Sequence, residues 1–121
     1  MKRNRIGTAS LCMLLLLLWS TVSFAATTVV GEGQQSRGYP GHNAEIHGNL
    51  FTLPSAGSIT AVEGRGASGF WIEKGSGEMV RNFNTLAQAQ GYSLSAGSYR
   101  VIPNIKDGVN SCGVTVTFTC P

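Results

Sequence analysis

The sequence predicts an all-β protein, a single small sandwich of about seven or eight antiparallel strands that is jelly-roll-like in form. The 121 residues include 16 glycines without a three-residue period, which excludes collagen. Between the glycines lie short runs rich in Val, Ile, Thr, Phe and Tyr, a composition typical of short strands joined by tight turns. No segment after residue 25 has a long helical period.

Residues 1–25 are expected to be a cleaved export signal. Three basic residues precede the apolar run at residues 11–19, and Ser23 and Ala25 place small side chains before a cleavage site. The run is shorter than the roughly twenty residues that span a bilayer, and Cys12 lies before its core, which argues against a lipoprotein signal. The mature chain is expected to be periplasmic or secreted, with no membrane insertion.

Removal of this signal leaves 96 residues without net charge, because the remaining six Lys and Arg balance six Asp and Glu. Neither a nucleic acid nor an anionic membrane surface is therefore expected as a partner. Residues 26–43 are expected to be an N-terminal strand and a Gly-rich linker, with a peripheral strand at 26–30 and a loop over 31–42. Residues 44–121 are expected to form the sandwich.

Within the sandwich, a hairpin turn is expected at residues 75–77, a loop at 64–69, and a helical turn at 84–90 with Asn84 as its cap. Residues 64–69 match G-x-G-x-x-G, but a strand follows instead of the helix that a dinucleotide needs, so no cofactor is expected. The remaining strands are expected at 45–53 (irregular near Gly48), 58–63, 70–74, 79–83, 91–95, 99–103 and 114–119.

The last of these strands has the clearest alternation. Val114, Val116 and Phe118 should lie on the buried face, and the three threonines between and after them on the other face.

A short motif occurs twice, at residues 51–60 and 92–100. Each copy has an aromatic residue, a Leu two positions later, and Ala-Gly-Ser before a large apolar residue. The repeat predicts two equivalent corners, each ending a strand on a buried Leu and turning at Gly57 or Gly97.

Residues 45–119 resemble bacterial pre-peptidase C-terminal domains. The resemblance is carried by the strand, Gly-rich turn and strand at residues 69–80, by the two Leu-to-Ala-Gly corners that flank it, and by the final Val/Thr strand. It implies a non-catalytic, jelly-roll-like module of the kind usually attached to secreted peptidases, where it often assists substrate binding or is trimmed away. This chain departs from the pattern because it carries no peptidase and has Ser68-Gly69 where an Asp is common. A calcium role is therefore not carried over.

Trp71 and Glu73 are the candidate ligand-binding residues. In a strand, Phe70 and Ile72 share one face and Trp71 and Glu73 share the other. If the first pair faces the core, Trp71 lies on the outer face, as a platform for a sugar ring or a peptide. The alternative is that the core takes Trp71 and Phe70 packs under a loop.

His42, Glu45 and His47 are weak candidates for a metal site. Glu45 and His47 would share a face of a strand, but zinc needs three or four ligands and no fourth is evident. The alternative, which we favour, is a pair of solvated histidines and no metal.

Enzymatic motifs are scarce, and no G-x-S-x-G nucleophile elbow occurs. Carboxylate pairs could come from Glu63, Glu73 and Glu78, and the last two are expected to lie across from each other beside the hairpin turn. A small secreted hydrolase is thus the least supported alternative, and the chain is expected not to be an enzyme.

Cys112 and Cys120 remain after Cys12 leaves with the signal. Export favours a disulfide, yet eight steps of about 3.3 Å along a straight strand separate the two Cα atoms by about 26 Å. A disulfide needs them within about 7 Å. An intramolecular bond would require the segment to fold back, and free thiols or a bond to a partner stay open.

The expected function is that of an exported, non-catalytic binding or accessory module for an unidentified protein or carbohydrate. A structural subunit of a surface or periplasmic assembly is the alternative, based on the Thr-rich last strand and the cysteine spacing.

The mature protein should begin at Ala26, since Ser23 and Ala25 fit the small-residue pockets of signal peptidase and a cut after Ala26 would place Phe24 in one of them. Intact-mass spectrometry of protein recovered outside the cytoplasm checks this. A mass that includes residues 1–25 would contradict export by cleavage.

Overall fold

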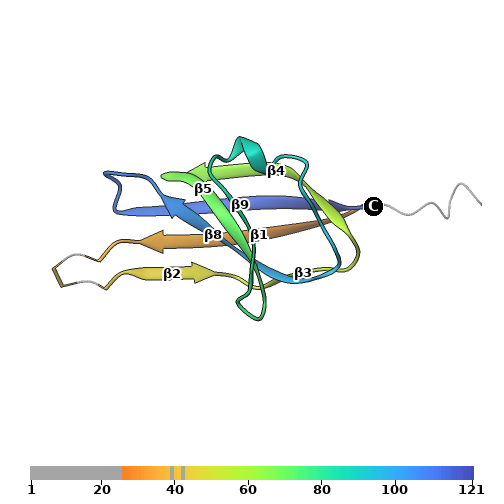
Figure 1. Cartoon of the computed structure of the whole chain (residues 1–121), viewed down its shortest axis with the longest axis horizontal. Helices are drawn as coiled ribbons and strands as arrows, with labels where there is room; N and C mark the ends of the chain where they lie inside the picture. The colour runs from red at the N-terminus through yellow and green to blue at the C-terminus, as the bar shows by residue number, and fades with distance from the viewer. Residues whose placement is uncertain (1–25, 39, 42) are drawn as a thin grey trace, which may run out of the picture.

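The computed structural model describes residues 26–38, 40–41 and 43–121. These residues form nine strands and one 3₁₀ turn, arranged as two antiparallel sheets (Figure 1). The expected all-β sandwich is confirmed, with nine strands instead of seven or eight. Within the described ranges, no helix is long and apolar enough to cross a membrane.

The two sheets are named A and B. Sheet A has the strand order β2-β1-β9-β4-β7, and sheet B has the order β3-β8-β5-β6. The strands of sheet A are β2 (Glu45–Gly48), β1 (Thr27–Ser36), β9 (Ser111–Cys120), β4 (Gly57–Arg65) and β7 (Ser93–Leu94). The strands of sheet B are β3 (Phe51–Leu53), β8 (Gly97–Ile105), β5 (Ala67–Lys74) and β6 (Met79–Phe83).

Strand β1 differs most from the expectation. It continues to Ser36, pairs with β9 along its length and with β2 over its second half, so it is an inner strand and not a peripheral one. The loop expected from residue 31 is therefore wrong for residues 31–36. Glycine at position 33 serves packing and not a loop, because a Cβ there would overlap the carbonyl oxygen of Val101 in β8. The glycine permits close backbone packing between the sheets.

Two further local expectations are corrected. The loop expected at residues 64–69 shrinks to Gly66, since β4 runs to Arg65 and β5 begins at Ala67. The helical turn is present as a 3₁₀ turn at Ala87–Ala89. Its N-cap residue is Leu86, which makes no side-chain capping hydrogen bond, so Asn84 is not the cap; the Gln88 N–H donates to Thr85 Oγ1 at 3.3 Å.

The core lies between the sheets and is centred on β9. Val114, Val116 and Phe118 are fully buried, and the intervening threonines are half-buried on the opposite face, which confirms the expected alternation. Phe118 stacks on Phe51 of β3 with ring centroids 5.1 Å apart. Aromatic contact across the sheets thus joins the central strand of sheet A to the edge of sheet B.

The two repeated corners pair with each other. In sheet B, Leu53 of β3 lies opposite Gly97 of β8, and in sheet A, Gly57 of β4 lies opposite Leu94 of β7. Each corner therefore takes the chain from one sheet to the other.

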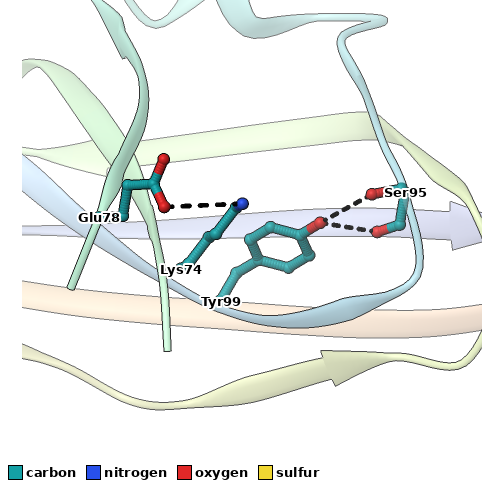
Figure 2. Close-up of polar contacts among 4 residues, drawn as sticks. All are labelled: Lys74, Glu78, Ser95 and Tyr99. Atoms are coloured by element: carbon teal, nitrogen blue, oxygen red, sulfur yellow. Dashed lines mark hydrogen bonds and ion pairs between the residues drawn. The ribbon is translucent and has the colours of Figure 1, made fainter. Parts of the chain in front are cut away.

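A tyrosine holds the second corner. The Tyr99 hydroxyl donates to the Ser95 carbonyl at 2.9 Å and lies 3.2 Å from Ser95 Oγ (Figure 2). The hydroxyl group of this buried tyrosine thus has hydrogen-bond partners at the point where the chain passes from one sheet to the other.

Phe118→Ala should destabilise the protein by roughly 3–5 kcal/mol, because it removes a fully buried ring from the centre of the core. Thr117→Ala is the matched control on the opposite face and should cost about 0.5 kcal/mol or less. Urea unfolding monitored by circular dichroism measures both. Equal midpoints for Phe118→Ala and the parent would show that β9 is not the central core strand.

Gly57→Ala and Gly97→Ala should each destabilise, for different reasons. Gly97 has a φ of +151°, a region that other residues enter at a cost on the order of 1–3 kcal/mol. A Cβ at Gly57 would lie 2.7 Å from Cys120 Sγ, an overpacking that costs roughly 1–3 kcal/mol.

Thermal melts of the two variants and of Gly57→Ala with Cys120→Ala separate these causes. The Cys120→Ala background should relieve most of the Gly57→Ala effect. If both single variants melt with the parent, the glycines of the repeat have no structural role.

Candidate functional site

Trp71 lies on the outer face of sheet B. Its neighbours Phe70 and Ile72 are fully buried between the sheets, whereas Trp71 and Glu73 are half-buried on the other face of β5. Of the two predicted orientations of Trp71, the one on the outer face is therefore observed. Trp71 Nε1 donates to Glu73 Oε1 at 3.0 Å, so the carboxylate orients the indole ring.

The register of sheet B determines what surrounds the indole. Ile102 of β8 and Asn82 of β6 lie opposite Trp71, and Arg100 lies opposite Glu73. Arg100 Nη1 donates to the Gly75 carbonyl at 2.9 Å. The outer face thus presents an aromatic ring, an apolar side chain and two opposite charges on adjacent strands.

Strand β2 forms a wall beside this face. The position of a Cβ at Gly48 lies 3.0 Å from the Val101 carbonyl oxygen, 3.1 Å from Ile102 Cγ1 and 3.2 Å from Arg100 Cβ. The absence of a side chain at Gly48 lets β2 approach β8 closely.

A cavity of about 560 Å³ lies between β2 and the outer face. We call it the Trp71 groove. Its lining comes from β2, β5 and β8 and consists of Ile46, His47, Gly48, Trp71, Glu73, Arg100 and Ile102.

A second cavity, of about 510 Å³, is lined by residues of β1, β2, β4 and β9, Arg65 among them, and we call it the Arg65 groove. Glu45 and His47 both line it, as expected for residues two apart in a strand. His47 also lines the Trp71 groove, and its Nε2 is hydrogen-bonded to Asn49 Oδ1 at 3.0 Å. His47 therefore lies between the Arg65 groove, which is lined mainly by polar residues, and the Trp71 groove, which contains an indole ring.

The metal candidates are only partly placed. His42 lies outside the described residues. Among the residues that the structure does place, no group of three or more His, Cys, Asp or Glu side chains is close enough to hold an ion. Glu45 and His47 supply two possible ligands, fewer than zinc requires, so the structure adds no support for a metal site here.

The carboxylates beside the hairpin do not form the expected pair. Met79, not Glu78, lies opposite Glu73 in the register. Glu78 instead contacts Lys74 Nζ at 3.7 Å, an exposed ion pair shown in Figure 2. The expectation of facing carboxylates is wrong because Glu78 lies one position nearer the turn, where its carbonyl accepts from the Lys74 N–H at 2.8 Å.

The two cysteines are free and lie at opposite ends of β9. Both are buried, Cys112 opposite Gln35 and Cys120 opposite Thr27 of β1. Burial raises the pKa of the Cys112 thiol, and a hydrogen bond with the Gln35 backbone and the nearby Arg37 charge only partly offset this. A buried thiol with a raised pKa is a poor nucleophile, which disfavours a bond from Cys112 to a partner.

Sequence reasoning missed Ile46, Arg100 and Ile102 as groove residues. Alternation along β8 does place Arg100 and Ile102 on one face. However, their position beside Trp71 depends on strand register, and the position of Ile46 depends on the contact of β2 with sheet B. Strand register and contacts between sheets have no local sequence signal.

The chain matches no family model, no curated protein and no solved structure. The resemblance to pre-peptidase C-terminal domains therefore stays an expectation.

Proposed function

We propose that this chain is an exported, non-catalytic binding module and that the Trp71 groove is its ligand-binding site. The observation that carries this proposal is the position of Trp71, half-buried in the groove and hydrogen-bonded to Glu73. Phe70 and Ile72 already fill the core beneath it, so packing of the sandwich does not account for the indole. Aromatic side chains dominate the energetics of binding surfaces.

The fixed orientation of the Trp71 ring lowers the conformational-entropy cost of ligand binding. A side chain that is already held in one orientation loses little conformational entropy when a ligand contacts it. The Trp71 groove has one carboxylate, Glu73, and it already accepts a hydrogen bond from the indole. Hydrolysis of a glycosidic bond by carboxylates uses two, so this groove supports binding in preference to hydrolysis.

A structural subunit is the second candidate. Val30 of β1 is exposed on the outer face of sheet A beside the Thr-rich β9, and this face could pack against another subunit. Light scattering distinguishes the candidates, because a subunit should self-associate and a binding module should remain monomeric without ligand.

Binding should be tested with an oligosaccharide array and with a phage library of random linear peptides. Compounds that bind are then titrated into the expected mature protein, which begins at Ala26, so that all tryptophan emission comes from Trp71. We expect a saturable change in emission, because the ligand covers the indole. Trp71→Ala, followed by calorimetry, should weaken binding by about tenfold or more.

Met79→Ala is the matched control, since Met79 is an exposed apolar residue of β6 that does not line the groove. It should change the affinity by about twofold or less. The proposal is wrong if neither screen yields a binder, or if Trp71→Ala binds as tightly as the parent.

A further inference from the structure

The outer edge of β2 has no partner strand among the described residues. β2 pairs only with β1, and Asn49 N–H donates to the Glu32 carbonyl at 3.0 Å. Because hydrogen-bonded pairs alternate along an antiparallel ladder, His47 and Glu45 also bond to β1. The N–H and C=O of Ile46, between them, therefore point away from β1.

The Trp71 groove lies where a further strand of sheet A would run. Gly33 and Gly48 place β1 and β2 directly against the backbone of Val101, so sheet A extends past the edge of β8. A strand added to β2 would continue sheet A over the outer face of sheet B. Ile102 and Trp71 would then lie beneath it.

The groove is apolar where such a strand would place its side chains. Ile46 is 59% exposed and Leu50 is 54% exposed. Alternation along β2 puts Ile46 on the same face as Gly48, and Leu50 follows just after the strand ends. At the far end, Leu50 Cδ1 lies 3.2 Å from the Cβ position of Gly75, whose carbonyl binds Arg100.

From these features we propose that the Trp71 groove receives an extended peptide that pairs with Ile46 of β2 as a sixth strand of sheet A. The inference rests on the proposed function and names the ligand class. Main-chain hydrogen bonds to the sheet edge would supply affinity, and alternate apolar side chains packed on Ile46, Trp71 and Ile102 would supply specificity. Glu73 and Arg100 lie opposite each other, so the floor adds no net charge and favours uncharged side chains.

A saccharide uses the groove differently. It would stack on Trp71 and bond to polar side chains such as Arg100 and Glu73, without the main chain of Ile46. The exposed apolar pair, Ile46 and Leu50, contributes little to sugar recognition, and this favours the peptide.

The test uses twelve-residue peptides enriched from the phage library on the parent protein and synthesised with blocked ends. Hydrogen exchange by NMR should show the Ile46 amide slowed about tenfold or more when such a peptide saturates the protein. The His47 amide is the internal control, since it already bonds to β1 and should change little.

Ile46→Pro removes the outward N–H without removing a bond to β1, and should weaken peptide binding about tenfold or more. Ile46→Ala keeps the N–H and should weaken binding less. If Ile46→Pro does not fold, as judged by its melt, the exchange of the parent's Ile46 amide decides alone.

The outcomes separate this inference from the proposed function. Peptides that need Trp71 but leave the Ile46 amide unprotected overturn strand addition. Oligosaccharides that bind through Trp71, with no peptide enriched, also overturn it and leave the binding module intact. Failure of both ligand classes overturns both proposals.

Discussion

The structure depends on the reciprocal pairing of two corners. Leu53 lies opposite Gly97 in sheet B, while Gly57 lies opposite Leu94 in sheet A. Because each corner carries the chain from one sheet to the other, the two sheets are joined covalently and by hydrogen bonds at the same place. The buried leucines anchor the strand ends in the core, and the glycines make room for the turns.

A second close contact between the sheets shapes the groove. Gly33 and Gly48 bring β1 and β2 against the backbone of β8. The sheets touch there through backbone atoms, so sheet A projects beyond sheet B and leaves a concave angle outside the core. Trp71 and Ile102 lie at the bottom of that angle. The high glycine content thus has two consequences: it closes the sandwich and it shapes the candidate binding site.

Fold class and strand alternation could be predicted from the sequence because both are local properties. Val114, Val116 and Phe118 alternate with threonines, and one face is buried as a direct result. The role of residues 31–36 could not be predicted, since a Gly-rich run forms a loop in one context and a closely packed inner strand in another. The groove could be predicted only in part. Alternation places Trp71 and Glu73 on one face of their strand. Ile46 and Arg100 lie beside them only because of strand register and contact between the sheets. Such long-range geometry has no signature in a short window of sequence.

Alternation also separates stability from recognition within β5. Phe70 and Ile72 hold the sheets together, and Trp71 and Glu73 point away from them. A change at Trp71 can therefore alter binding while the core stays filled, because the two faces share a backbone but few side-chain contacts. Strand β5 pairs with both β6 and β8, so it is an inner strand and forms the floor of the groove. Edge strand β2, four residues long and bonded on one side, forms the wall. An aromatic floor beside a strand edge that is unpaired within the described residues suits the proposed extended peptide, which would pair its main chain with β2 and place alternate side chains on Trp71.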